Sequence, residues 1–111
     1  MILQIRDKSE LELELEQAGD KLVLVDFYAT WCGPCRKIAP VVEKIATEHA
    51  SEVLLLKVDI DEVEEVVGEY AVEVMPTFVF QRNGVKLDTL VGSNEHKLRQ
   101  LIERHLEERQ Q

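Results

Sequence analysis

The sequence of 111 residues has little of what defines several protein classes: two cysteines, three prolines, one tryptophan and no apolar run longer than four residues. Two cysteines are too few for the disulfide framework of a small secreted scaffold. A transmembrane helix needs about 20 consecutive apolar residues, so none is expected. The first six residues already include Arg6 and lead into no long apolar segment, which argues against a secretory signal. The expected location is the cytoplasm, with nuclear entry also allowed.

Positive charge is also scarce. The 13 Lys and Arg residues face 22 Asp and Glu residues, which leaves a formal net charge of −9 at pH 7. Nucleic acids and anionic membranes attract positive surfaces, so this charge argues against both as partners. The length leaves room for one domain, which we expect to span residues 1–111.

Hydrophobic periodicity divides the chain into strands and helices. Apolar segments bounded by turn residues predict strands at residues 3–5, 22–28, 53–58, 77–82 and 85–91, the last two joined by Asn83-Gly84 as a hairpin turn. Helical spacing predicts helices over residues 9–18, from about 32 to 49, over 63–70 and from 93 or 94 to 106.

The pattern of the first helix is compatible with a strand as well as a helix. Glu10–Glu16 alternates apolar and acidic residues, as a strand would. Leu and Glu are nevertheless good helix formers, and the stretch contains no β-branched residue. Ser9 and Glu12 have the spacing of a capping box, so we predict that a helix begins there.

The predicted element order is βαβαβα followed by ββα. Strands that alternate with helices pair in parallel through right-handed crossovers, and the hairpin adds antiparallel strands. We therefore expect an α/β fold, a mixed and mostly parallel central sheet of about five strands with four helices on both faces. An active site in such a sheet lies at the carboxyl ends of the parallel strands, where the loop after Tyr28 is expected.

Both cysteines lie in that loop, in the run Trp31-Cys32-Gly33-Pro34-Cys35. With a helix starting near Cys32, the two sulfurs share one face and are close enough to bridge. Unpaired N–H groups at the helix start favour a thiolate at Cys32, whereas Cys35, one turn in, is expected to be more shielded. This asymmetry suits dithiol exchange, in which one thiolate attacks and the other resolves the mixed disulfide.

A permanent disulfide and half of a zinc site are the alternatives for the cysteine pair. A bridge across so short a loop restrains the unfolded chain little. A zinc site needs two further ligands, and His49, His96 and His105 are distant single residues without ligand spacing. We therefore expect redox chemistry and no bound metal.

Asp26 is the one acid in an otherwise apolar strand. Burial should raise its pKa and make it a candidate proton acceptor near neutral pH. The alternative is a residue held by structural hydrogen bonds. Lys57, in the neighbouring predicted strand, could pair with Asp26 and modulate it, or could extend from the strand end to solvent.

The run Asp26-Phe27-Tyr28-Ala29-Thr30-Trp31-Cys32-Gly33-Pro34-Cys35, followed by Met75-Pro76-Thr77 and Gly92, resembles the thioredoxin family over essentially the whole chain. The resemblance is greatest to the cytosolic, animal-type members. It implies the thioredoxin fold and a buried Asp26 that assists proton transfer when Cys35 attacks. It also implies that Asp61 holds the indole N–H of Trp31.

The resemblance further implies a substrate-binding surface beside the cysteines. Pro76 is expected to form a cis peptide bond with Met75 and to face the disulfide, so that the backbone before it pairs with an extended substrate. Gly92 would let that segment approach closely. The expected substrate-binding residues are Trp31, Gly33, Pro34, Met75, Pro76, Thr77 and Gly92.

The implied function is general protein disulfide reduction. The pair Gly33-Pro34 is uncharged, whereas a histidine between the cysteines would favour an oxidant. The family implies recharging by a flavin-containing, NADPH-dependent thioredoxin reductase, with no cofactor bound by this chain. Many animal members carry extra cysteines where this chain has Val63, Tyr70 and Val74, so a monomer without further thiol regulation is expected.

Two alternatives compete with this function. A glutaredoxin-like, glutathione-linked oxidoreductase usually has Pro-Tyr between its cysteines and no tryptophan before them. A non-enzymatic subunit of the same fold could use the stretch from residue 59 to 73, which holds seven carboxylates and no Lys or Arg, as a docking face. That stretch could equally be a solvated helix face.

Overall fold

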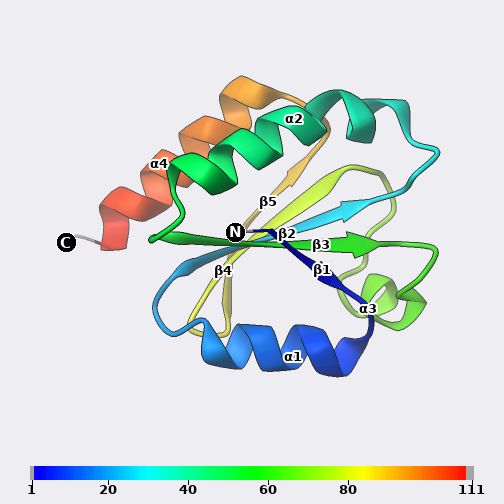
Figure 1. Cartoon of the computed structure of the whole chain (residues 1–111), viewed down its shortest axis with the longest axis horizontal. Coiled ribbons are helices and arrows are strands. Elements are labelled where there is room, and N and C mark those ends of the chain that lie inside the picture. Colours follow the sequence, from blue (N-terminus) through cyan, green and yellow to red (C-terminus); the bar gives the residue numbers. More distant parts are fainter. Residues whose placement is uncertain (1, 110–111) are drawn as a thin grey trace.

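The computed structural model describes residues 2–109, which form five strands and four helices around one central sheet (Figure 1). In chain order these are β1 (Ile2–Ile5), α1 (Lys8–Gln17), β2 (Leu22–Tyr28), α2 (Gly33–Glu48), β3 (Val53–Asp59), α3 (Glu64–Glu69), β4 (Thr77–Arg82), β5 (Val85–Val91) and α4 (Glu95–Arg109).

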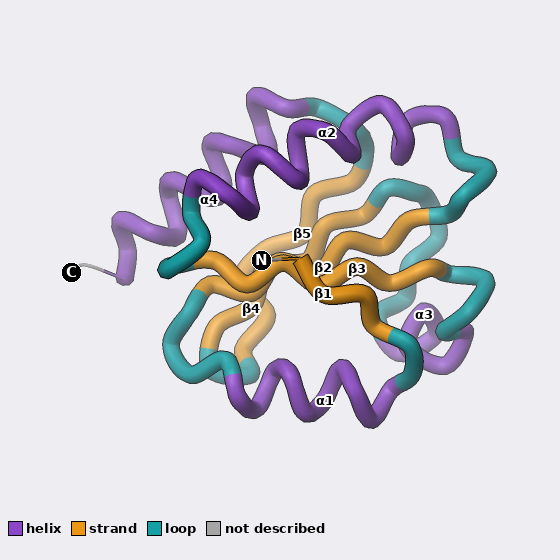
Figure 2. Tube along the Cα trace, in the orientation of Figure 1, coloured by secondary structure: helices purple, strands orange, loops and turns teal. Residues whose placement is uncertain are grey.

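The strand order in the sheet is β1-β3-β2-β4-β5. β3 pairs in parallel with β1 and β2, whereas β4 pairs antiparallel with β2 and β5. Only β4 therefore runs against the other strands of this sheet. Helices α2 and α4 cover one face, and α1 and α3 cover the other (Figures 1 and 2). The predicted mixed sheet with helices on both faces is confirmed.

Side-chain alternation along β2 divides the core into two layers, because successive residues of a strand point to opposite faces. Leu22 and Leu24 pack with residues of α2 and α4. Val23, Val25 and Phe27 pack on the side of α1 and α3. Asp26 continues the series of Leu22 and Leu24, so the strand carries its carboxyl group toward α2.

The sheet register determines the neighbours of Asp26. It lies opposite Lys57 of β3 on one side and Phe78 of β4 on the other. Phe78 is fully buried, so an aromatic ring flanks the carboxyl group and a lysine stem lies across from it. A buried carboxyl group beside an aromatic ring has lost most of its hydration.

The start of α1 differs from the prediction. The helix begins at Lys8, and Asp7 is the N-cap, with its carboxylate accepting from the backbone N–H of Glu10 at 2.8 Å. The expected capping box of Ser9 and Glu12 is therefore wrong. Asp caps a helix as well as Ser does, and Asp7 comes first along the chain.

Two other turn and cap predictions are confirmed. Asn94 caps α4, because its side-chain oxygen accepts from the N–H of Lys97 at 3.0 Å. Asn83 and Gly84 have φ of 53° and 76°, the positive values that a two-residue type I′ hairpin requires.

The last turn of α4 is tied to the hairpin through His105. The buried imidazole lies 2.9 Å from Glu108 and 3.3 Å from Asp88 of β5. Arg82 of β4 donates to the carbonyl oxygen of His105 at 2.9 Å. The sequence assigned no role to the C-terminal tail, and Glu108 shows that part of it anchors α4. Gln110 and Gln111 lie outside the described residues.

Two leucine substitutions test the layered core. Leu24→Ala removes a fully buried side chain and should lower the free energy of unfolding by about 2–5 kcal/mol. The matched change Leu13→Ala, at a leucine of α1 that is 48% exposed, should change it by about 0.5 kcal/mol or less. Urea denaturation of the oxidised proteins measures both values, and equal losses would contradict the assigned core.

Candidate active site

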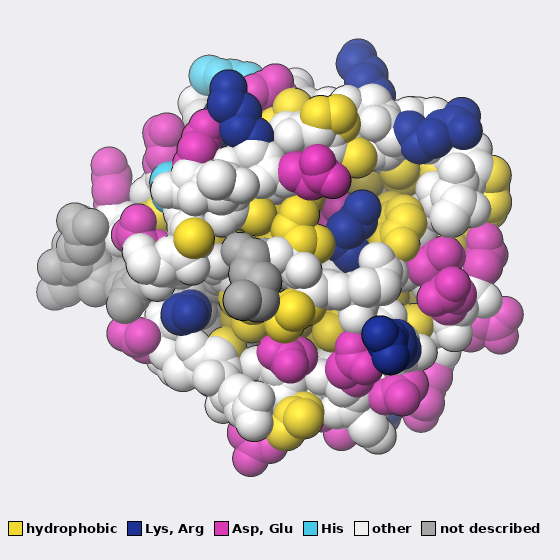
Figure 3. Space-filling view, viewed as in Figure 1, with side chains coloured by type: hydrophobic (Ala, Val, Ile, Leu, Met, Phe, Trp, Pro, Cys, Tyr) yellow, Lys and Arg dark blue, Asp and Glu magenta, His cyan; other side chains and the backbone are white. Residues whose placement is uncertain are grey.

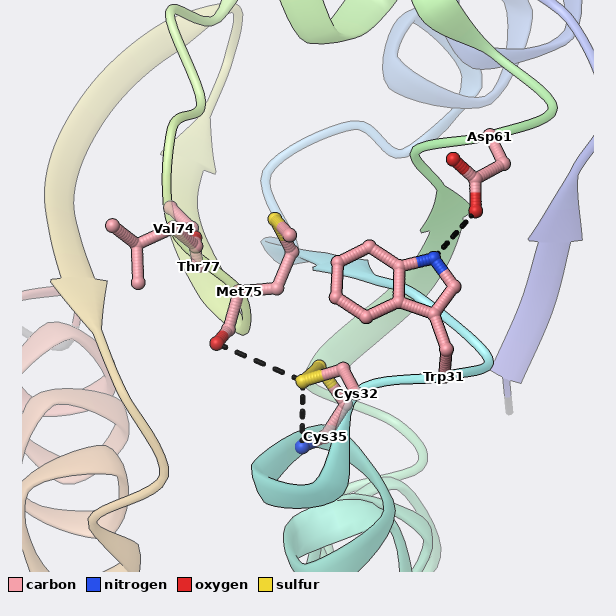
Figure 4. Close-up of a disulfide and its surroundings, with 7 residues drawn as sticks. All are labelled: Trp31, Cys32, Cys35, Asp61, Val74, Met75 and Thr77. Carbon is pink, nitrogen blue, oxygen red and sulfur yellow. Dashed lines mark hydrogen bonds between the residues drawn. A yellow bond between two sulfur atoms is a disulfide. The ribbon is translucent and has the colours of Figure 1, made fainter.

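The two cysteines lie where the carboxyl end of β2 leads into α2. Cys32 is the N-cap of α2, and its sulfur accepts from the backbone N–H of Cys35 at 3.2 Å (Figure 4). The two Cα atoms are 5.3 Å apart, and a disulfide joins the sulfurs. The predicted position at a helix N-terminus is confirmed, so an N–H group is aimed at the sulfur of Cys32.

The expected difference in shielding between the cysteines is wrong. Both residues are 6% exposed, because they pack with Ala29 and against Tyr28, Ile60 and Met75. They differ instead in what they face. The sulfur of Cys32 lies 3.7 Å from the carbonyl oxygen of Met75, toward the surface segment that precedes β4 (Figure 4). Cys35 lines a partly open pocket between α2 and the sheet.

The segment before β4 holds Met75 against the disulfide. The Met75–Pro76 peptide bond is cis, as the resemblance implied. The carbonyl oxygen of Pro76 accepts from the N–H of Gly92 at 2.9 Å, and the hydroxyl of Thr77 donates to the carbonyl oxygen of Val74. Thr77 and Pro76 are buried, so they support the segment from within, while Met75 faces Cys32.

Gly92 is needed for a different reason from the one expected. A Cβ atom at this position would meet no heavy atom within 4 Å, so close approach of another chain segment does not require glycine. Its φ is +103°, however, a conformation that L side chains rarely adopt. Gly92 therefore allows the backbone to turn after β5 and donate to Pro76.

Trp31 lies beside the disulfide and is 63% exposed. Its indole N–H donates to the carboxylate of Asp61 at 2.9 Å, as expected (Figure 4). The N–H of Asp61 in turn donates to the buried Asp59 at 2.9 Å. Because Asp61 is held by the buried Asp59, its carboxylate fixes the orientation of the indole ring next to Cys32. So exposed a ring does not act as an anchor in the hydrophobic core.

An acidic rim surrounds α3. Six of the seven carboxylates between residues 59 and 73 are exposed, and Figure 3 shows acidic side chains gathered at the lower right, around α3 and α1. Lys8 of α1 forms ion pairs with Glu65 and Glu69. These pairs favour a solvated helix face over a docking face, because two of the exposed carboxylates already have a partner within the chain.

Asp26 is buried on the α2 side of β2, with 3% of its surface exposed. Its Oδ1 atom has no hydrogen-bond partner within residues 2–109. Burial raises the pKa of the Asp26 carboxyl to about 7, and the positive charge of Lys57 opposes part of that rise. Near neutral pH the group is therefore present in both protonation states, as a proton acceptor and donor must be.

A cavity of about 250 Å³ connects these groups. It lies between β2, β3 and α2 and is lined by Asp26, Tyr28, Ala29, Thr30, Cys35, Arg36, Ala39 and Lys57. Asp26 and Cys35 thus line the same partly open pocket. A larger cavity of about 500 Å³ lies between β5 and α4, but it contains neither cysteine.

The sequence predictions missed Tyr28 and Arg36, which line this cavity beside Asp26 and Cys35. The signal for Tyr28 was present, because it lies two residues after Asp26 in the same strand and shares its face. Val91, exposed at the end of β5, was not singled out either, and an exposed apolar residue at a strand end has no distinctive pattern.

Other kinds of site find no support in the part of the chain that the structure describes. Residues 2–109 contain no group of three or more His, Cys, Asp or Glu side chains placed to hold a metal ion. Within the same residues no helix is long and apolar enough to cross a membrane.

The chain is similar to known proteins over nearly all of its length. Residues 3–104 match the family model for thioredoxin. The chain is 48% identical to Thioredoxin-T of Drosophila melanogaster over 95% of this chain and 67% of that protein. It is 44% identical to thioredoxin of Ictalurus punctatus over 95% and 99% of the two chains. The crystal structure of Fasciola hepatica thioredoxin superposes with a TM-score of 0.90 at 46% identity, covering 93% of this chain and 98% of that one.

The similarity to thioredoxins is consistent with a redox-active dithiol at the end of β2. They favour a catalytic cysteine pair over the glutaredoxin-like and the non-enzymatic alternatives, because the proteins matched are thioredoxins over most of both chains. Together with the Cys32–Cys35 disulfide at the helix N-terminus, they establish that this chain belongs to the thioredoxin family and is a thiol-disulfide oxidoreductase that reduces protein disulfides.

Proposed function

We propose that the chain is a general protein disulfide reductase in which Cys32 attacks the substrate and Cys35 resolves the mixed disulfide. The observation that carries this assignment is the opposite surroundings of the two sulfurs. Cys32 faces the surface segment at Met75, and Cys35 faces the cavity that contains Asp26. In this proposal residues 1–111 act as a single domain and as a monomer, since every group in the scheme belongs to one chain. The location we propose is the cytoplasm.

In the first step the Cys32 thiolate attacks one sulfur of a substrate disulfide. A mixed disulfide forms, and the second substrate sulfur leaves as a thiolate. The N–H of Cys35, which lies 3.2 Å from the sulfur of Cys32, stabilises the attacking thiolate together with the dipole of α2.

In the second step Asp26 accepts the proton of Cys35 across the shared cavity. The Cys35 thiolate then attacks the sulfur of Cys32, the Cys32–Cys35 disulfide forms, and the substrate sulfur leaves. The substrate has gained two electrons and this chain has lost two. A pKa of about 7 suits Asp26 to this role, because it can take up and return a proton near neutral pH. Lys57 modulates Asp26 through its charge.

Substrate binding uses the surface on both sides of Cys32. Trp31, Gly33 and Pro34 are exposed on one side. On the other side, Met75 presents its backbone carbonyl, supported by Pro76, Thr77 and Gly92. An extended segment that contains the target disulfide can lie between them and pair with the backbone at Met75.

A reductase must be recharged after each turnover. We assign this step to a flavin-containing thioredoxin reductase that takes electrons from NADPH, with no cofactor held by this chain. The net charge of −9 favours reductases and substrates with neutral or basic surfaces around their sulfur atoms.

Serine variants separate the roles of the two cysteines. Cys32→Ser should abolish insulin reduction by NADPH and reductase, because no nucleophile remains. Cys35→Ser should also stop turnover but accumulate mixed disulfides with substrates, since nothing resolves them. Insulin turbidity and mass spectrometry of the trapped products measure both outcomes. Activity of Cys32→Ser equal to the parent would contradict the scheme, and reduction by glutathione alone would favour the glutaredoxin-like alternative.

Asp26→Asn tests the buried carboxyl through stability. The folded-state pKa of about 7 lies above the unfolded value, so the native state binds more protons between about pH 4 and 7. The free energy of unfolding of the parent therefore falls as pH rises through this range. The Asp26→Asn variant does not lose this stability, because an amide does not titrate. The stability advantage of the variant should grow by up to about 4 kcal/mol between pH 4 and pH 8.

Urea denaturation of the oxidised proteins at both pH values measures this advantage without thiol titration. Glu16→Gln, which removes one exposed negative charge from α1, controls for the change in net charge. An advantage for Asp26→Asn that does not change with pH would show that this carboxyl has no raised pKa.

A further inference from the structure

Tyr28 makes a contact that the scheme above does not use. The ammonium nitrogen of Lys57 lies over the Tyr28 ring, 4.4 Å from its centroid. Both side chains line the cavity that Asp26 and Cys35 share. An ammonium group at this distance from an aromatic face is attracted by the ring quadrupole, more strongly where it is partly shielded from water.

The strand geometry places two potential partners, Asp26 and Tyr28, within reach of the Lys57 side chain. Asp26 and Tyr28 lie two residues apart on the same face of β2, and Lys57 of β3 is paired with Asp26 in the sheet register. Its side chain could therefore turn back to Asp26 or forward to Tyr28. Within residues 2–109 no ion pair of 4.0 Å or less joins Lys57 and Asp26, and the ammonium group lies on the ring instead.

Within residues 2–109 no ion pair of 4.0 Å or less joins Lys57 to any acidic side chain, so the Tyr28 ring is its nearest described charge-stabilising contact. Arg36 enters from α2 with a positive charge, and Cys35 is neutral in the disulfide. Burial, together with the carboxylates of Asp59 and Glu62, raises the pKa of the Tyr28 phenol, so the ring stays neutral near pH 7. Lys57 is half-buried, and a lysine without such a contact extends its charge to water.

We propose that Tyr28 is a positioning residue for disulfide exchange, whose ring holds the Lys57 ammonium at the edge of the cavity shared by Asp26 and Cys35. The charge then acts on Asp26 from outside hydrogen-bond distance. A direct ion pair would keep Asp26 ionised and make it a poor holder of the Cys35 proton. Full withdrawal of the charge into water would keep Asp26 protonated and unable to accept that proton. The consequence for catalysis rests on the proposed role of Asp26.

The test is the titration of Asp26 in four oxidised variants: Tyr28→Phe, Tyr28→Leu, Lys57→Met and the double variant Tyr28→Leu/Lys57→Met. The ¹³Cγ chemical shift of Asp26 in carboxyl-labelled protein reports its protonation directly. The disulfide removes thiol titration from the measurement, and thermal melts confirm that each variant is folded. Tyr28→Phe keeps the ring and is the matched control.

Tyr28→Leu should raise the titration midpoint of Asp26 by about half a pH unit, because Lys57 then turns to solvent. Tyr28→Phe should stay within about 0.2 unit of the parent. Lys57→Met should raise the midpoint at least as much as Tyr28→Leu. In the Lys57→Met background, Tyr28→Leu should add nothing further, because the charge that the ring holds is absent.

Three results would overturn the proposal: an unchanged or lowered midpoint in Tyr28→Leu, a shift in Tyr28→Phe as large as in Tyr28→Leu, or the same shift from Tyr28→Leu with and without Lys57. The last would mean that the ring only excludes water. The pH profile of insulin reduction separates this outcome from failure of the proposed function. If the Asp26 midpoint moves but the rate profile does not, Tyr28 positions Lys57 and Asp26 is not the proton acceptor.

Discussion

The alternation of side chains along β2 determines where the groups of this site lie. One strand contributes Val23, Val25 and Phe27 to one core layer and Leu22 and Leu24 to the other. The same two-residue period then brings Asp26 and Tyr28 under α2, and the strand ends at the loop that carries the cysteines. A shift of one residue in register would turn Asp26 toward α1 and replace it under α2 with an apolar side chain.

This arrangement gives the disulfide two sides with different chemistry. The outer side presents Cys32, the ring of Trp31 and the backbone of Met75, which are suited to contact a protein. The inner side presents Cys35, Asp26 and Lys57 along one partly open pocket, in which the proposed proton transfer between Cys35 and Asp26 takes place. In the proposed mechanism the dithiol thus exchanges electrons with a protein partner on one side, while a proton passes between Cys35 and Asp26 on the other.

Much of this could be predicted from the sequence, because the strongest signals are local. The apolar run of β2, the Asn83-Gly84 turn and the spacing of the cysteines each have a direct physical meaning. The α1 cap was misassigned because Asp7 and Ser9 are both good N-caps and only the tertiary fold selects one. The cis bond at Pro76 came from the family resemblance alone, since a sequence does not reveal peptide isomers.

The features that escaped prediction depend on contacts between distant segments. The equal burial of the two cysteines depends on packing against Ile60 and Met75 from other segments, and the contact of Lys57 with Tyr28 depends on pairing of β2 with β3. Gly92 was expected to allow close approach of another segment, whereas its positive φ is what requires glycine. That backbone angle could not be inferred from the neighbouring residues in the sequence.

In the proposed mechanism, the position of Cys32 at the N-terminus of α2 makes its sulfur the reactive one, although both cysteines are equally buried. Brief alkylation of the reduced protein with iodoacetamide at pH 7, followed by peptide mass spectrometry, tests this directly. We expect a product carrying one label on Cys32, formed at least about ten times faster than any product labelled on Cys35. Equal rates at the two cysteines, or faster labelling of Cys35, would contradict it.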